Sequence, residues 1–367
     1  MHADAPQRFP ARCGPGRMGA WIPGTNSMRC ALFDHLDWRD EPVSRIYADR
    51  LALIRAAEQG GFCAYHLAEH HGTPLGLAPS PGIFLAAVAR ETRTLRFGPM
   101  VYCLPLYQPL RLLEEICMLD QLSDGRLEVG VGRGASPFEN ACYGVTPEQS
   151  VERYVETLEI LRRGLAGNEL SYSGKYYSYD RVSLPLRPRQ ARIPFWAAPA
   201  TPEAQGHAAK DGMNIMVLGS SERVREICTG YRARWQEARA RPDAAAADPS
   251  GPLLGAYRMV VVARTGALAE QRARPAYAKW FEHLSLLWKR HNATTPFLSI
   301  GDFDNARAQG MVVTGSPAEV RDLLQAQAAQ CGFNYAALEF AFGTLGHAAE
   351  MESLALFSEQ VLPALKA

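Results

Sequence analysis

The sequence lacks the features that mark membrane, secreted and nucleic-acid-binding proteins. No apolar run approaches the ~20 residues that a membrane-spanning helix requires. The eight cysteines are scattered and include no C-x-x-C pair, which favours reduced thiols in the cytoplasm over a disulfide framework or a thiolate zinc site. The net charge is only +1, which argues against nucleic acid or an acidic membrane surface as the main partner.

The first 27 residues also lack a recognisable structural pattern. They carry Arg8, Arg12 and Arg17 among scattered Pro and Gly, without the continuous apolar segment of a secretory signal. We interpret residues 1–27 as a disordered leader and residues 28–367 as one domain. The composition of the chain, 47% hydrophobic and 21% charged, is that of an ordinary globular protein.

What the sequence does contain is an alternation of short apolar runs with helical patterns. Eight segments are expected to hold a strand that leads to a helix: 29–38, 62–70, 94–104, 126–134, 193–204, 212–223, 255–264 and 335–343. Eight such units indicate an α/β protein with a (β/α)8 barrel, the TIM-barrel fold. Insertions are expected after strand 4, as a hairpin at 171–188, and after strand 7, with an amphipathic helix at 268–291.

One stretch concentrates histidine. "YHLAEHHGTPLGLAPSPG" reads H-x-x-E-H at His66, Glu69 and His70, the inverted zinc-peptidase pattern. That pattern needs both histidines one turn apart on a helix, whereas this segment reads as a strand. The histidines would then lie about 13 Å apart at ~3.3 Å per residue, too far to share an ion. No metal site is predicted. His66 is expected inside the barrel, and Glu69, His70 and His71 at the strand end where barrel enzymes keep their chemistry.

Several segments, in this order, resemble the bacterial luciferase-like flavin monooxygenase superfamily. They are "LAEHHG", "TLRFGPMVYCLP", "QPLRLLEEICMLDQLSDGRLEVGVGRG", "GVTPEQSVERYVETLEIL" and the late "VVTGSPAEVRDLL". The resemblance implies FMN at the C-terminal mouth of the barrel, delivered in reduced form by a separate NAD(P)H:flavin reductase. It also implies oxidation of a small organic substrate by O2 through a flavin C4a-peroxide, in a pocket that excludes water. It does not fix the substrate.

The resemblance assigns residues to the FMN phosphate. Arg133, in "GVGRGA", and Arg153, at the start of the following helix, match the family's phosphate-side arginines. Gly134 permits close approach of the backbone. Ala200 and Thr201 open a helix, where Thr201 serves both as N-cap and as hydroxyl donor.

Two further matches concern the flavin ring. Pro99–Met100 corresponds to the position at which family members hold a non-prolyl cis peptide beneath the ring. Gly132 stands where the family has a reactive thiol, so no reactive cysteine is expected at that point. The G-x-G-x-G pattern around this residue lacks the spacing of a dinucleotide fold.

His70 matches the histidine that serves family members as general base or hydrogen-bond partner near the flavin. Glu69 is expected to orient His70 or to contact the ring edge, with a structural carboxylate as the alternative. The substrate side is expected to be formed by His35, Asp37, Trp38, His71, Tyr102 and Leu106.

Three other functions stay open from the sequence. One is hydride transfer with a deazaflavin coenzyme on the same fold, one is flavin binding without turnover as a supporting subunit, and one is the zinc peptidase. The resemblance also allows a homodimer, for which the sequence itself gives no sign.

Overall fold

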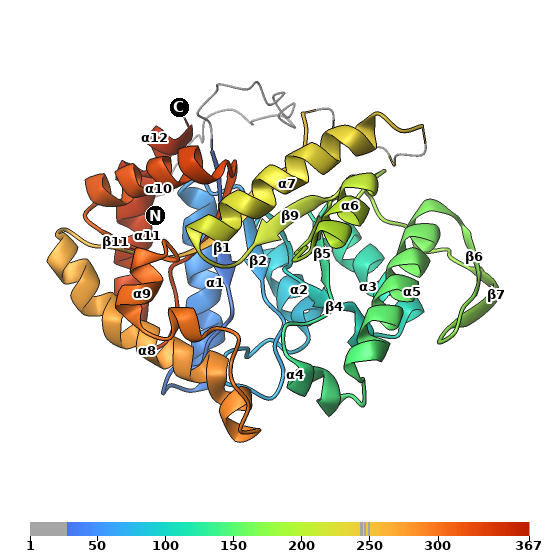
Figure 1. Ribbon diagram of the computed structural model, residues 1–367, viewed down its shortest axis with the longest axis horizontal. Helices are drawn as coiled ribbons and strands as arrows, with labels where there is room; N and C mark the ends of the chain where they lie inside the picture. The colour runs from blue at the N-terminus through green and yellow to red at the C-terminus, as the bar shows by residue number, and fades with distance from the viewer. Residues whose placement is uncertain (1–27, 243–244, 246, 249, 367) are drawn as a thin grey trace, which may run out of the picture.

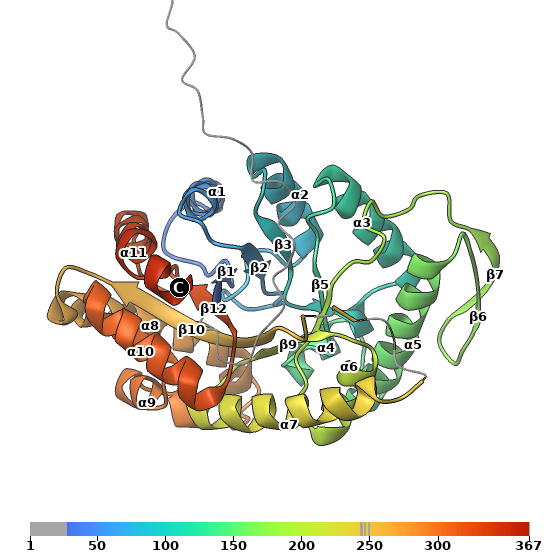
Figure 2. The same ribbon diagram turned by 90° about the horizontal axis from the view of Figure 1, so that it is seen from above.

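The alternating strand and helix patterns fold into a nearly closed ring of parallel strands covered by helices (Figures 1 and 2). The computed structural model describes residues 28–242, 245, 247–248 and 250–366, so the predicted leader lies outside the described residues. The parallel strands are β1 (Arg29–Asp34), β2 (Ala64–Leu67), β3 (Arg96–Pro99), β4 (Tyr102–Cys103), β5 (Val129–Gly132), β8 (Phe195–Ala197), β9 (Asn214–Val217), β10 (Leu254–Val262), β11 (Val312–Gly315) and β12 (Tyr335–Glu339).

Most helices follow a strand and pack on the outside of the ring (Figure 2). They are α1 (Val43–Gln59), α2 (Pro81–Glu91), α3 (Pro109–Leu122), α4 (Pro137–Cys142), α5 (Pro147–Ala166), α6 (Pro202–Lys210), α7 (Ser221–Arg239), α8 (Gly266–Arg290), α9 (Phe303–Ala308), α10 (Pro317–Cys331), α11 (His347–Gln360) and α12 (Leu362–Lys366), with short 3-10 turns η1 (Leu104–Leu106) and η2 (Leu298–Ile300). In the described part of the chain, no helix has the length and apolar character needed to cross a lipid bilayer.

The strand order confirms the predicted (β/α)8 barrel. Neighbouring strands run β3-β2-β1-β12-β10-β9-β8-β5-β4, all parallel, and an isolated bridge between Phe97 and Leu127 links β3 to the segment before β5. Both predicted insertions are present. The first contains the antiparallel hairpin β6 (Glu169–Ser173) and β7 (Ser178–Ser183), and the second contains the long helix α8.

Two elements differ from the sequence prediction. The expected strand 94–104 is divided into β3 and β4, because the chain breaks its strand pairing at residues 100–101. The strand β11, which pairs with β10, was not predicted. Its four residues directly precede the capping box of α10, formed by Ser316 and Glu319 as predicted, and the helix signal concealed the short strand.

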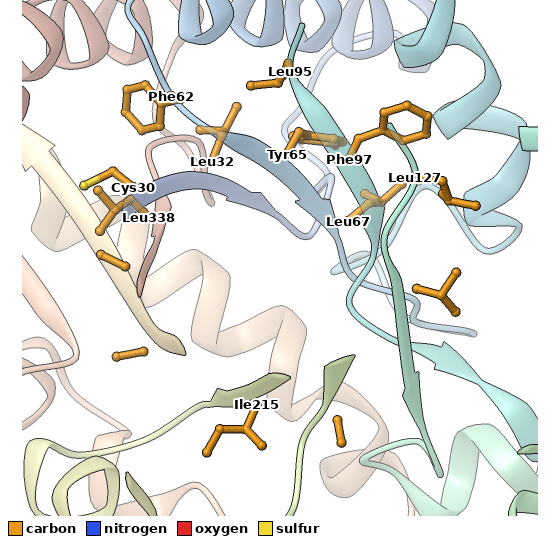
Figure 3. Close-up of a cluster of buried hydrophobic side chains, with 14 of the residues drawn as sticks. Cys30, Leu32, Phe62, Tyr65, Leu67, Leu95, Phe97, Leu127, Ile215 and Leu338 are labelled. Carbon is orange, nitrogen blue, oxygen red and sulfur yellow. The ribbon is translucent and has the colours of Figure 1, made fainter. Parts of the chain in front are cut away.

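Alternate residues of each strand enter two different clusters. Cys30 and Leu32 of β1 belong to the layer between strands and helices, whereas Ala31 and Phe33 belong to the barrel interior. The outer layer is continuous across neighbouring strands, as the adjacent Tyr65 and Phe97 show (Figure 3).

His66 shares the interior face of β2, and the structure confirms its predicted place inside the barrel. It is 0% exposed, and its Nε2 lies 2.6 Å from the hydroxyl of Tyr335. Burial lowers the pKa of His66 to about 4, because the interior disfavours the charged imidazolium.

This pKa predicts a dependence of stability on pH. The unfolded chain takes up a proton near the ordinary pKa of 6.5, whereas the folded chain does so only near pH 4. The contribution of neutral His66 to the free energy of unfolding is therefore fully present above pH 6.5 and is lost as the pH falls toward 4. We expect the free energy of unfolding to fall by about 2 kcal/mol between pH 6.5 and 5 through this group, measured by urea titration. In His66→Gln that part of the slope should vanish, and equal slopes for both proteins would contradict the assignment.

Candidate active site

The C-terminal ends of the strands meet at one mouth, on the side where α4 and the last turns of α8 lie (Figure 1). The turn after β1 brings His35 and Asp37 to this mouth. Leu36, between them, has a φ of 56°, and its N–H donates to the Asp34 carboxylate at 2.7 Å. Both His35 and Asp37 are buried, at 3% and 2% exposure.

His70 lies at the mouth and is held by a carboxylate from another element. Its Nδ1 is 3.1 Å from Oε1 of Glu139, a residue of α4, and its side chain is 14% exposed. The second oxygen of Glu139 accepts the main-chain N–H of His71 at 3.0 Å. Because the Glu139 carboxylate is engaged twice, it fixes the ring of His70 relative to the end of β2. The ring of His35 lies 5.5 Å away.

Glu69 does not orient His70, which corrects one of the two expected roles. Its Oε1 lies 2.9 Å from Nε2 of His71, while its Oε2 accepts the N–H of Cys103 at 3.0 Å and the hydroxyl of Tyr107 at 2.9 Å. The reason is the alternation of an extended chain: neighbouring residues diverge, whereas residues two apart converge. Glu69 therefore pairs with His71, and His70 is left to Glu139.

A chain of hydrogen bonds connects Glu69 with the protein surface. The hydroxyl of Tyr143, whose side chain is 52% exposed, lies 2.8 Å from Nδ1 of His71. Since a carboxylate only accepts, Nε2 of His71 donates to Glu69. His71 thus links a buried acid with an exposed phenol.

Buried acids also pair with the other histidines of the mouth. Oε1 of Glu339, at the end of β12, lies 2.9 Å from Nδ1 of His35, and its second oxygen accepts the hydroxyl of Tyr257. Burial of His35 disfavours its protonation, but the charge of Glu339 and this hydrogen bond outweigh that effect and raise the pKa of His35.

On the α8 side, Nδ1 of His283 lies 2.6 Å from the Asp37 carboxylate, and the Trp38 ring lies 6.3 Å from the His283 ring. Burial raises the pKa of Asp37, although the hydrogen bond and charge of His283 oppose the rise.

The cis peptide is Met100–Val101, one bond later than the predicted Pro99–Met100. Pro99 is still in register with Leu67, and the N–H of Met100 donates to the Leu67 carbonyl at 2.7 Å. The Pro99–Met100 bond is therefore part of regular strand pairing, and the departure from it begins with the next bond. Met100 itself is buried in the interior cluster.

Tyr102 does not join the mouth, contrary to the expected substrate role. Its side chain lies in the outer cluster, and its hydroxyl donates to Glu115 of α3 at 2.8 Å. The reason is the break between β3 and β4, because a continuous strand would have placed Tyr102 on the same face as Met100. Leu106, in η1, is partly exposed.

The two candidate phosphate arginines lie on neighbouring elements. Arg133 follows β5 and is exposed, and its guanidinium forms no ion pair with another described residue. It lies near Tyr154, the neighbour of Arg153: burial and the Asp211 carboxylate raise the pKa of Tyr154 to about 12, and the charge of Arg133 opposes that rise. The Arg153 guanidinium lies over the Tyr176 ring at 5.0 Å, and its Nε is buried without a hydrogen-bond partner.

The segment after β8 lies beside the Arg133 loop. β5 and β8 are paired, with Val131 opposite Ala197, so Arg133 and residues 200–201 both emerge from adjacent strand ends. Ala200 and Thr201 are exposed. Thr201 is the N-cap of α6, and its Oγ1 accepts the N–H of Ala204 at 3.3 Å. Its hydroxyl proton can still be donated.

Glycines shape the loop between these groups. A Cβ on Gly132 would lie 2.4 Å from Cγ2 of Val101, so only glycine fits against the residue that follows the cis bond. Gly134 has a φ of 85°, a conformation that favours glycine. Gly132 therefore provides close packing at the position where the family has a thiol.

No group of three or more His, Cys, Asp and Glu side chains in the described part of the chain is arranged to hold a metal ion. His66 and His70 have separate partners, Tyr335 and Glu139, on different elements. The zinc-peptidase alternative therefore has no support in this geometry.

Sequence reasoning missed the partners of the predicted residues. They are Glu139, Tyr143, Tyr107, His283 and Glu339. Glu339 could have been found, since an acid in the apolar run "YAALEFAFG" at a strand end is a signal of function. Glu139, Tyr143 and His283 lie in the insertions, where no periodicity indicates which residues face the mouth.

Comparison with known proteins places this geometry in a family. Residues 28–335 match the sequence profile of the luciferase-like monooxygenase family. The uncharacterized protein y4wF of Sinorhizobium fredii is 41% identical over 315 residues, which are 86% of this chain and 90% of that protein. The oxygenase component of a flavin-dependent trigonelline monooxygenase from Acinetobacter baylyi is 28% identical over 204 residues, 53% of this chain and 56% of that protein.

Solved structures share the fold. The oxygenating constituent of 3,6-diketocamphane monooxygenase from Pseudomonas putida, in complex with FMN, has a TM-score of 0.77 at 19% identity, covering 92% of this chain and 98% of that chain. The coenzyme F420-dependent tetrahydromethanopterin reductase from Methanopyrus kandleri has a TM-score of 0.68 at 19% identity, covering 93% of this chain and 100% of that chain.

The cysteines near the mouth allow a direct test of this geometry. Burial, followed by the charges of Glu69 and Glu139, raises the pKa of the Cys103 thiol well above its usual range, whereas Cys142 at the end of α4 is exposed. In a Cys13→Ser background, we expect iodoacetamide at pH 8 to label Cys142 first and Cys103 only after unfolding, followed by peptide mass spectrometry. Cys142→Ser should remove the fast phase. Rapid labelling of Cys103 in the folded protein would show that the loop is packed differently.

Proposed function

Because this chain belongs to the luciferase-like monooxygenase family, we propose that it is the oxygenase component of a two-component system. It takes up reduced FMN from a separate NAD(P)H:flavin reductase and adds one atom of O2 to a small organic substrate. The observations that support the proposal are that Arg133 lies near Tyr154, the neighbour of Arg153 on α5, and that the strands leading to Arg133 and to α6 are paired. His70 lies at the mouth formed by the strand ends.

The residues present fit the phosphate of FMN. Arg153 has a buried Nε without a partner, and Arg133 has an exposed guanidinium without an ion pair among the described residues. A phosphate dianion would satisfy both arginines, and the free N–H groups at the start of α6 would add donors. Thr201 could donate its hydroxyl proton to the same group.

The flavin supplies the redox chemistry when bound, and the chain supplies binding, proton control and exclusion of water. His70 presents an imidazole at the mouth and is fixed by Glu139, which suits it to hold or transfer a proton at Nε2. His71 and Tyr143 connect the buried Glu69 to the surface and offer a second path for protons. The end of α8 covers this side, and the Thr73 hydroxyl donates to the His283 carbonyl at 2.7 Å.

The names of two similar proteins support this function. The trigonelline enzyme is called a flavin-dependent oxygenase component, and the diketocamphane enzyme is an oxygenating constituent in complex with FMN. The F420-dependent reductase shares the fold, so a deazaflavin is the alternative cofactor to test. A supporting subunit without turnover would have no use for the His70–Glu139 pair.

Removal of either arginine should weaken FMN binding. We expect Arg133→Ala and Arg153→Ala each to raise the Kd for FMN about 10- to 100-fold, since each deletes a charge-assisted hydrogen bond worth about 1.5–3 kcal/mol. Equilibrium dialysis or flavin fluorescence would measure it, with coenzyme F420 titrated in parallel.

Arg163→Ala is the matched control, because Arg163 lies on the same helix as Arg153 but pairs with Glu159 at the surface. It should leave the Kd unchanged. Equal Kd values for the wild type and both test variants, or tighter binding of F420 than of FMN, would refute the assignment.

The role of His70 can be separated from flavin binding. In His70→Ala we expect the Kd for FMN to change less than about threefold, because the phosphate is assigned to Arg133, Arg153 and Thr201 and not to this ring. The fraction of oxidised FMN that yields oxygenated product from a panel of neutral ketones and alkenes should fall at least about tenfold, since general acid–base catalysis contributes 10²–10⁴-fold. Glu139→Gln should shift the pH profile of this fraction. Undiminished coupling in His70→Ala would remove it from the mechanism.

A further inference from the structure

We propose that the small cavity between His70, α4 and α8 is the substrate pocket, and that it takes a neutral, mainly hydrocarbon molecule carrying one hydrogen-bonding oxygen. This inference rests on the proposed function, because it places the substrate beside the flavin mouth. It goes further in naming the substrate class and the residue that anchors the substrate's oxygen, Ser136.

The walls of the cavity are mostly apolar. They are formed by His70, Thr73, Leu75, Ala135, Ser136, Glu139, Leu284, Leu287, Trp288 and Phe297. The apolar side comes from α8 and the segment after it, and the polar side comes from the ends of β2 and the Arg133 loop. Ala135 and Ser136 directly follow the loop that we assign to the flavin phosphate, so the cavity adjoins that site.

The charges around the cavity disfavour an anionic substrate. None of the lining residues is a lysine or an arginine, and Glu139 contributes a carboxylate to the wall. A buried substrate anion would therefore lack a cation to compensate its desolvation and would face a like charge. A neutral molecule meets neither cost.

Ser136 is the polar group left available for a substrate. It is 5% exposed, and its Oγ is buried without a hydrogen-bond partner. It is the N-cap residue of α4, yet its side chain makes no capping hydrogen bond. The other hydroxyl in the wall, that of Thr73, already donates to the His283 carbonyl. A buried hydroxyl without a partner is costly, and a carbonyl or hydroxyl oxygen of a ligand would satisfy it.

The cavity must widen to admit such a molecule. It has room for about one water molecule. Beside it, at the lining residue Trp288, lies an aromatic contact between α4 and the end of α8. The Phe138 ring is stacked on His291 at 4.2 Å and meets Trp288 edge-on at 4.9 Å (compare α4 and α8 in Figure 1). His291 is exposed, so separation of this pair breaks few buried contacts. The short helix α4 thus carries both Phe138, which makes the aromatic contact, and Glu139, which lines the cavity.

The test of the anchor uses two probes of equal shape, cyclohexanone and methylenecyclohexane, titrated calorimetrically into the full chain with and without oxidised FMN. In Ser136→Ala the Kd for cyclohexanone should rise about fivefold, and the Kd for methylenecyclohexane should stay within about twofold, because only the ketone loses a hydrogen bond. Thermal stability should not fall, since the Ser136 hydroxyl bonds to nothing in the protein.

The test of charge uses cyclohexanecarboxylate. The wild-type chain should bind it at least about tenfold more weakly than cyclohexanone. Leu284→Lys introduces a cation into the wall and should reverse this preference. Leu298→Lys is the matched control, because Leu298 is 62% exposed and does not line the cavity, and it should leave both affinities unchanged.

The inference is overturned if Ser136→Ala affects both isosteric probes alike, if the wild type binds the carboxylate as well as the ketone, or if Leu284→Lys behaves like Leu298→Lys. Loss of FMN affinity in Ser136→Ala with unchanged ketone binding would assign the residue to the flavin instead. Failure of the proposed function is distinguishable, since it would appear as absent FMN binding by the wild type whatever the probes show.

Discussion

The register of a closed parallel barrel is the constraint on which the rest of this structure depends. Parallel strands end at the same mouth, and alternate residues face either the interior or the helix layer. His35, Glu339 and His70 are distant in the chain and meet only because β1, β2 and β12 are neighbours in the ring. A slip of one residue in any strand would send its functional side chain into the outer core.

Within that frame, the site is organised by pairing each histidine with its own acid. His35 pairs with Glu339, His70 with Glu139, His71 with Glu69, and His283 with Asp37. Three of the pairs join two segments of the fold, whereas Glu69 and His71 lie two residues apart in the segment after β2. Burial of a charged carboxylate alone would be costly, and the imidazole N–H groups offset that cost. The same contacts therefore stabilise the mouth and set the orientation of its proton-carrying rings.

The sequence predicted the fold more completely than the site, for a physical reason. Periodicity and capping residues define helices such as α5 and α10, and Gly and Pro mark the turns between them. The ends of β1, β2 and β5 were located in the same way, which placed His35, His70 and Arg133 at strand ends, whereas the roles expected of His70 and Arg133 came from the resemblance. Periodicity does not report a broken strand. The expected run 94–104 reads as continuous, so both the position of the cis bond and the face of Tyr102 were misplaced. Nor does it report contacts between insertions, where Glu139 and His283 lie.

The distribution of charge explains how a chain with a net charge of +1 could bind the phosphate of the proposed FMN. Arg133 is exposed after β5 and Arg153 lies on α5, whereas the acids of the mouth, on β12, on α4 and after β2, are buried. The positive side is left without acidic partners among the described residues, and the acids of the negative side are hydrogen-bonded to histidines. A phosphate would therefore be drawn to one edge of the mouth, and the ring of the ligand would extend toward the histidines. Separation of charge over a short distance, rather than net charge, gives the site its polarity.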